Sequence, residues 1–251
     1  MPKTLKYTDC LPKFMARVAN LKKANSTQYL WLYEHGCNAH RHRFTRHFNC
    51  FIKQFDIQEK KGALDIEAGG LNADFDIMLS YCIKTIGENE YLYDYITKRD
   101  LDAGNYDKRL IETLIPSIKQ YDRIVTHYGD AGRFDIPFIK ARYLWLKARG
   151  LYEGEDFPSW GEVYQSDTYT FAKRTLKITS RRQNSIANAI LGKDVKTKID
   201  KDYWMDVKYG NKEQHMKAVE YILDHNMRDC EQLEDNYITL LPFVKESKKS
   251  L

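Results

Sequence analysis

Two acidic side chains end a short apolar stretch of the chain. Residues 62–67 read GALDIE, so Asp65 and Glu67 stand two positions apart. Side chains alternate between the two faces of a strand, so these carboxylates share a face if the stretch is a strand. Two neighbouring carboxylates repel each other unless a cation neutralises them. Gly69 and Gly70 follow and permit a sharp turn beside such a site. The pattern favours a cation site at the end of a buried strand; an exposed acidic strand end is the plainer alternative.

Two later motifs carry further acids. Asp135 follows an apolar run and a glycine-rich turn, HYGDAGR, and precedes Ile-Pro-Phe-Ile. We predict that a helix begins there with Asp135 as its N-cap, a role worth about 1 kcal/mol that does not exclude metal binding. His225 and Asp229 are four positions apart and share one face of a predicted helix, with Tyr221 one turn earlier. Taken alone, such a helical pair is more often a surface contact than a site.

Together, the three motifs resemble those of the DEDD superfamily of 3′–5′ exonucleases, whose ribonuclease-H-like fold holds four acids. LDIEAGGL at residues 64–71 resembles the first motif, FDIPFI at 134–139 with Arg142 beyond it the second, and residues 225–229 the third. The resemblance spans residues 62–237 and implies two Mg²⁺ or Mn²⁺ ions, hard cations that prefer oxygen ligands. One ion would activate the attacking water and the other would stabilise the leaving 3′-oxygen. The implied ligands are Asp65, Glu67, Asp135 and Asp229.

The fifth residue departs from the family pattern. Members of the family carry either a tyrosine four residues before the last aspartate or a histidine five residues before it, whereas His225 stands at the tyrosine spacing. The subclass is therefore open, but a histidine there can still orient or deprotonate water at neutral pH. Asp224 holds the other position and is interpreted as a bystander. Asp167, at the end of a predicted strand, is a further acid that could face the same cleft.

A dense group of histidines and cysteines precedes the first acidic motif. Five zinc-binding side chains fall within fourteen residues, and a structural zinc site takes four of them. Either of two sets fits the spacing, because His40 and His42 are interchangeable beside the remaining three, and a loop of solvated histidines is the alternative. Similar clusters are a feature of phage-type relatives of the exonuclease family. The group is Cys37, His40, His42, His47 and Cys50, with Arg41, Arg43 and Arg46 between them as predicted phosphate contacts.

Two tracts of the chain are strongly basic. Residues 1–60 carry eleven Lys and Arg against four Asp and Glu, and residues 173–201 carry nine against two. Basic tracts on either side of an acidic centre suit a polyanion gripped beside a metal site, although each tract alone could be a solvated face. Tyr203 and Trp204 could stack on a base, or Trp204 could belong to the core. In the second tract we expect nucleic acid to contact Arg174, Lys177, Arg181 and Arg182, with Lys193, Lys196, Lys198 and Lys201 continuing the charge.

The patterning predicts an α/β fold with a ribonuclease-H-like mixed sheet flanked by helices. We expect a basic N-terminal region at 1–60 with a zinc cluster, an exonuclease domain at 61–243 and a charged, frayed tail at 244–251. In the first region, residues 9–24 predict a short basic helix and 27–56 strand-like aromatic stretches. In the second, strands are predicted at 62–67, 77–84, 90–96, 123–128 and 163–170. Helices are predicted at 106–120, 136–149, 184–191 and 213–237.

Composition narrows the class of protein. The chain has 251 residues, no apolar run long enough for a bilayer and charged residues throughout its first twenty positions, so we expect an intracellular, cytoplasmic protein (host cytoplasm if viral). Its five cysteines, an odd number, argue against a disulfide framework. We predict a 3′–5′ exonuclease with DNA, single-stranded or 3′-ended, as the favoured substrate and replication or recombination proteins as partners. The alternatives are an endonuclease or RNA-directed nuclease on the same fold and a non-catalytic, zinc-dependent nucleic-acid-binding protein.

Overall fold

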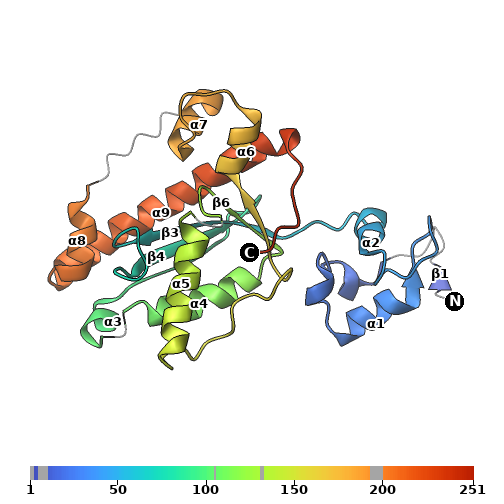
Figure 1. The fold of residues 1–251 in the computed structure, drawn as a ribbon, viewed down its shortest axis with the longest axis horizontal. Helices are drawn as coiled ribbons and strands as arrows, with labels where there is room; N and C mark the ends of the chain where they lie inside the picture. Colours follow the sequence, from blue (N-terminus) through green and yellow to red (C-terminus); the bar gives the residue numbers. More distant parts are fainter. Residues whose placement is uncertain (1–2, 5–10, 105, 131–132, 193–199) are drawn as a thin grey trace. The chain divides into compact units, whose positions relative to one another are not determined.

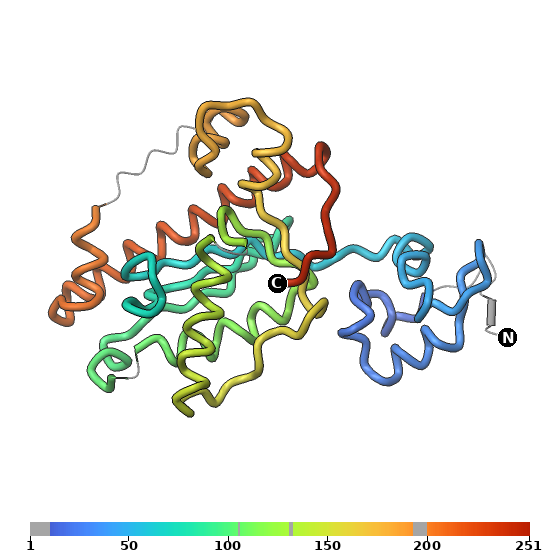
Figure 2. The backbone as a smooth tube through the Cα atoms, viewed as in Figure 1, coloured from blue at the N-terminus to red at the C-terminus, as the bar shows by residue number. Residues whose placement is uncertain are grey.

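The chain forms two compact units, residues 1–60 and 61–251. The computed structural model describes residues 3–4, 11–104, 106–130, 133–192 and 200–251 (Figures 1 and 2). Each unit has its own hydrophobic core: Met15, Leu32, Phe44 and Phe51 are fully buried in the first, and the core of the second is much larger. No helix in the described part of the chain is long and apolar enough to cross a membrane.

The second unit is built on a five-stranded mixed sheet, as predicted. Its strand order is β5-β4-β3-β6-β7, in which β4 runs antiparallel to both of its neighbours and β6 and β7 run parallel to β3. The central position of β3 puts the first acidic motif in the middle of the sheet. The strands are β3 (Lys61–Ala68), β4 (Met78–Thr85), β5 (Tyr91–Tyr95), β6 (Arg123–Thr126) and β7 (Tyr164–Asp167).

Helices cover both faces of this sheet. All eight residues of β4 are buried, which requires cover on each side. On one face Tyr81 and Ile83 pack in the main core with α4 (Lys108–Lys119) and α5 (Asp135–Ala148). On the other face α9 (Lys212–Leu240) runs along β3 and β4 (Figure 1). Cross-strand partners share a face, so Asp65 of β3, which pairs with Cys82, faces α9.

The remaining helices of this unit are short. Asp167 ends β7 and caps α6, because its side chain accepts a hydrogen bond from the backbone of Thr170, so the strand predicted at 163–170 is half helix. Gly192 closes α7 with a left-handed backbone (φ 64°), a conformation that glycine adopts without strain. The sequence patterns missed α3 and α8. These helices are α3 (Lys98–Asp102), α6 (Thr168–Thr175), α7 (Gln183–Leu191), α8 (Asp202–Tyr209) and the 3₁₀ turn η3 (Leu241–Phe243).

The first unit differs from its prediction. The aromatic stretch predicted as strand is a helix, α1 (Ser26–Glu34), because Asn25 and Gln28 form a reciprocal capping box at its start. The basic helix predicted at 9–24 is replaced, over its described residues, by two 3₁₀ turns, η1 (Lys13–Met15) and η2 (Leu21–Lys23); the side chain of Asn20 caps the second. The other elements are β1 (Lys3–Thr4), β2 (His35–Gly36) and α2 (Phe48–Gln54).

The last residues of the chain lie along β7 and do not fray. The backbone N–H of Gln165 donates to the carbonyl of Lys249 at 2.8 Å, and that of Leu251 donates to the carbonyl of Val163 at 2.9 Å. Ser250 forms an isolated antiparallel bridge with Tyr164, and both Ser250 and Leu251 are buried. The expectation of a frayed tail is therefore wrong, and Figure 2 shows the chain returning to the sheet at its C-terminus.

Candidate metal centres

Among the residues that the structure describes, the second half of β3 has a strand partner on one side only. β3 pairs with β4 along its length, but its pairing with β6 extends only from Lys61 to Ala63. The backbone N–H of Ile66 is therefore not used by β6, and it donates instead to the carboxylate of Asp135. Beyond Ala63, where β3 and β6 no longer pair, the carboxylate of Asp135 from the next motif therefore meets the backbone of β3.

Asp135 is placed by its helix and by a close glycine. It is the first residue of α5 and is buried, while Phe134 takes the cap position without a side-chain hydrogen bond. The predicted N-cap role of Asp135 is therefore wrong, because its carboxylate faces the sheet. A Cβ atom at Gly129 would lie 2.3 Å from Oδ2 of Asp135, so only glycine permits this approach.

Helix α9 brings the third motif to the same place. Nδ1 of His225 lies 3.5 Å from Oε1 of Glu67 and 3.2 Å from Oδ2 of Asp229. Ligand atoms of these three residues all lie within 4.8 Å of one another. On the adjacent position of the helix, the fully buried Asn226 donates from Nδ2 to Asp65. Asp224 points elsewhere and pairs with Arg228 at the surface, 2.8 Å away.

The electrostatics of this cluster reflect crowded, buried carboxylates. Burial raises the pKa of Asp65 well above its usual range, and the charges of Asp229, Glu67 and Asp135 raise it further. Burial also raises the pKa of Glu67, and it raises that of Asp135 to about 7. The adjacent carboxylates of Asp229 and Glu67 raise the pKa of His225 to about 10. The cluster therefore needs positive charge to ionise fully, and its four carboxylates offer the oxygen donors that Mg²⁺ or Mn²⁺ prefers.

Several residues that support the cluster carry no sequence signal. Asn226 lies next to a predicted residue, but nothing in the sequence says that it reaches β3. The amide of Gln183 donates to the backbone carbonyl of Asp229 at 2.7 Å and so ties the start of α7 to the site. Asp167, the further acid expected near the cleft, accepts from Gly129 N at 3.0 Å and from Arg133 at 2.8 Å, and its charge raises the pKa of Asp135.

The second basic tract is only partly described. Arg174, Lys177 and Arg182 are exposed on and after α6, and Arg181 is half-buried, with its backbone bonded to His127. Because Gln183 is held at Asp229, this segment runs close to the acidic cluster. The predicted residues Lys193, Lys196 and Lys198 lie outside the described residues.

The expected stacking of Tyr203 on a base does not fit the structure. Its ring stacks on Tyr221 of α9, with centroids 4.2 Å apart. Trp204 packs edge-on against His225 at 6.2 Å and its side chain hydrogen-bonds to Glu67. Both rings are partly buried against the main core, so α8 covers one side of the acidic cluster.

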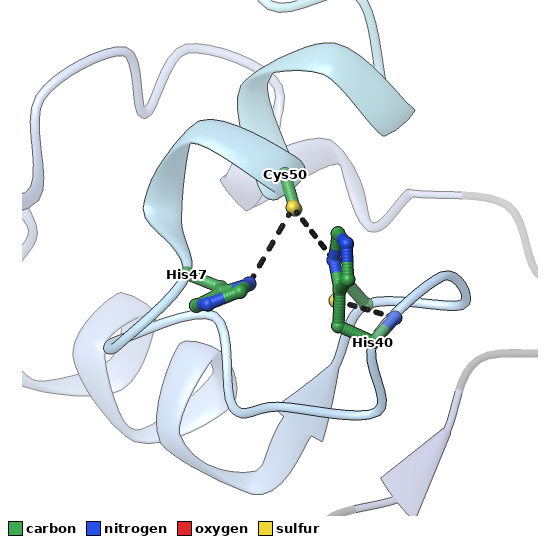
Figure 3. Close-up of side chains that lie close together, drawn as sticks. His40, His47 and Cys50 are labelled. Atoms are coloured by element: carbon green, nitrogen blue, oxygen red, sulfur yellow. Dashed lines mark hydrogen bonds between the residues drawn. The ribbon is translucent and has the colours of Figure 1, made fainter.

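The first unit gathers a second group of ligand atoms. Ligand atoms of Cys37, His40, His47 and Cys50 lie within 4.8 Å of one another. Sγ of Cys50 lies 3.4 Å from Nδ1 of His40 and 3.7 Å from Nδ1 of His47 (Figure 3), and Sγ of Cys37 lies 3.5 Å from Nδ1 of His40. Tetrahedral zinc with Zn–S near 2.3 Å and Zn–N near 2.05 Å separates sulfur from nitrogen by about 3.6 Å. The four residues therefore have the donors and spacing of a structural zinc site.

Of the five predicted zinc ligands, His42 is the one that lies outside this group. Its Nδ1 lies 3.2 Å from Nε2 of His47, so it neighbours a ligand-type residue without belonging to the set of four. At Cys37, burial raises the thiol pKa, but hydrogen bonds from the backbone of His40 and His42 outweigh it and lower the pKa. A thiol that ionises more readily is a better metal ligand.

Comparison with known proteins places the second unit in a wider group. Residues 63–240 match the family model described as the RNase H superfamily. Part of the chain is similar to a DNA polymerase of Methanocaldococcus jannaschii, with 30% identity over 131 residues that cover 45% of this chain and 8% of the polymerase. The chain thus corresponds to a small part of that polymerase. Residues 1–60, with the Cys/His group, lie outside the family match.

Proposed function

The chain belongs to the RNase H superfamily, and from this premise we propose that it is a metal-dependent 3′–5′ exonuclease that hydrolyses nucleic-acid phosphodiesters, with DNA as the favoured substrate. The observation that carries the proposal is the meeting of three distant motifs: the acids of β3, the buried acid that begins α5, and the His225–Asp229 pair of α9. The similarity to part of a DNA polymerase supports DNA over RNA.

The proposed site would hold two divalent cations through Asp65, Glu67, Asp135 and Asp229. When bound, such ions activate water and neutralise the charge that develops on the leaving oxygen. The protein's own contribution is to fix the carboxylates. Asn226 holds Asp65, and the backbone N–H of Ile66 holds Asp135.

His225 has a positioning role in this proposal. It lies between Glu67 and Asp229, and with a pKa of about 10 it carries a proton at neutral pH in the absence of metal. A protonated imidazole is a donor, so in the metal-free state it is suited to orienting the two carboxylates. Bound cations would neutralise those carboxylates and lower the pKa of His225, so proton abstraction from water stays the alternative role.

The test uses end-labelled single-stranded and duplex DNA and RNA with Mg²⁺ or Mn²⁺. A 5′-labelled strand should shorten stepwise from its 3′ end, and both Asp65→Ala and Asp229→Ala should lower the rate by orders of magnitude while remaining folded. The matched control is Asp224→Ala, since Asp224 lies on the same helix but pairs with Arg228 at the surface. Internal cuts would favour an endonuclease. Normal cleavage by either active-site variant would refute the site.

A further inference from the structure

Helix α1 of the first unit is apolar on two opposite faces. Its inner face packs into the small core, where Leu32 is buried and Trp31 contacts Phe44 and Phe51. Its outer face carries Tyr29, Leu30 and Tyr33, which fall within about 100° of arc on a helical wheel. A helix of a solvated protein normally presents polar residues on its outer face, so this face has the composition of a contact surface.

The outer face is widely accessible to solvent. Tyr29 is 48% exposed, Leu30 56% and Tyr33 45%. We call these three residues the aromatic face. Tyr29 and Tyr33 are rings, whose flat π-surfaces stack well on other planar groups.

Positive charge adjoins the aromatic face. The guanidinium carbon of Arg43 lies 3.8 Å from the centroid of the Tyr33 ring, a stacked cation–π contact. Arg41 and Arg46 are exposed in the same loop, which also carries the predicted zinc ligands His40 and His47. Residues 11–60 hold nine Lys and Arg against three Asp and Glu. Aromatic rings next to a cationic loop complement a flexible polyanion with planar bases.

We propose that the aromatic face binds single-stranded nucleic acid, with bases stacked on Tyr29 and Tyr33 and phosphates against Arg41, Arg43 and Arg46. Free bases can stack on exposed rings, whereas the bases of a duplex already stack on each other, so single strands are the preferred ligand. The excess of positive charge favours a nucleic acid over a protein partner or a second copy of the chain. This is a second binding surface, in the unit outside the family match, and it does not depend on the cleavage proposed above.

The test measures binding in the full-length Asp65→Ala background, so that no cleavage intervenes. Fluorescence anisotropy follows a labelled oligothymidylate of about 15 nucleotides, enough to span a typical single-strand site. Changing both Tyr29 and Tyr33 to Ala should weaken binding about tenfold or more. Changing both to Phe should preserve binding, because the ring is retained. The matched control is Tyr93→Ala, which removes a ring that is 50% exposed on β5 and should leave affinity unchanged.

Three results would overturn the proposal. The first is an Ala double variant, folded by circular dichroism, that binds the oligonucleotide as tightly as its parent. The second is an equal loss of affinity for single-stranded and duplex DNA, which would show that the two rings do not act by stacking on free bases. The third is conversion of a dimer to a monomer by light scattering with unchanged nucleic-acid affinity, which would make this face a contact between copies of the chain. Absence of cleavage by the wild-type protein would leave the binding result intact.

Discussion

At the scale of single residues, Asn226 ties helix α9 to Asp65 of β3. It is fully buried in α9, accepts a hydrogen bond from the hydroxyl of Ser80 at 3.0 Å and donates to Asp65. Because its oxygen is occupied by Ser80, its amide N–H groups must point toward the carboxylate. The orientation of Asp65 therefore depends on a residue that carries no charge.

We predict that Asn226→Ala lowers the rate of nucleic-acid hydrolysis about 10- to 100-fold, the usual effect of losing a partner that orients a metal ligand. The rate should be partly restored by raising the concentration of Mg²⁺ or Mn²⁺, because the weakened property is cation affinity. Ser80→Ala is the control. It removes the hydrogen bond to the Asn226 oxygen but keeps the donor to Asp65, so it should lower the rate of hydrolysis less. An Asn226→Ala protein with full activity at low metal concentration would contradict this role.

The acids of the site could be predicted from local sequence patterns, but the residues that hold them in place could not. Asp65, Glu67 and the His225–Asp229 pair follow from alternation along a strand and spacing on a helix, which are properties of neighbouring residues. The contacts of Asn226 with Asp65 and of Gln183 with the Asp229 carbonyl join residues 161 and 46 positions apart, so they exist only in the fold. For Asp135 the local pattern was misleading. Its position suggested an N-cap, but β3 and β6 do not pair beyond Ala63, and the Asp135 carboxylate accepts a hydrogen bond from Ile66 there.

At the scale of elements, the C-terminal segment is tied to the sheet through one carboxylate. Glu246 lies 2.7 Å from Nζ of Lys61 and accepts hydrogen bonds from Tyr237 at 2.6 Å and Ser166 at 2.9 Å. The buried Arg123 of β6 approaches it at 3.3 Å. Burial raises the pKa of Glu246, but Arg123 and these hydrogen bonds outweigh burial and hold the pKa below its ordinary value. The tail, β6 and α9 therefore share one ionic junction.

We predict that Glu246→Gln destabilises the folded protein at pH 7 by about 1–3 kcal/mol, the range for removing a charged hydrogen-bond partner. A lowered pKa in the folded state gives stability that is complete above the unfolded value, about 4.3, and is lost as the pH falls through the folded value. The difference in free energy of unfolding between wild type and variant should therefore be largest near neutral pH and should disappear below about pH 4. Urea unfolding of both proteins across this range measures it.

The control for this prediction is Glu153→Gln, at a side chain that is 79% exposed and pairs with Lys108 at the surface. It should change stability by less than about 1 kcal/mol at every pH. A gap for Glu246→Gln that does not narrow in acid would contradict the ionic junction.

Prediction of elements succeeded where periodicity is strong. The short apolar strands and the long helix α9 follow from the distribution of apolar residues. The strand prediction for the stretch YLWLY of α1 was wrong. This stretch is apolar on both faces of the helix, so it lacks the helical period and resembles a buried strand. The prediction of a frayed tail failed for a different reason. The charged residues of the tail suggested exposure to solvent, but their partners, Arg123 and Lys61, lie on strands that are distant in the sequence.

At the scale of the whole molecule, two units with separate cores depend on different sources of stability. The second unit is large enough to be held by its own hydrophobic burial. Among its described residues, the first has only eight fully or nearly buried apolar residues in its core. Domains of about 60 residues with so little core usually need a metal or a disulfide. Its paired Cys and His side chains would supply that support as a zinc site.

We predict that the protein purifies with about one zinc per chain, since four donors complete a structural site. Cys37→Ala and Cys50→Ala should each abolish the bound zinc, measured by elemental analysis, and should make residues 11–60 sensitive to limited proteolysis. His42→Ala removes a neighbouring histidine outside the group of four, so it should retain both zinc and protease resistance.

Because the cores are separate, the second unit should keep its thermal transition in the cysteine variants. Loss of zinc in His42→Ala with retention in Cys50→Ala would show that the ligand set is wrong, and simultaneous unfolding of both units would show that their stabilities are coupled.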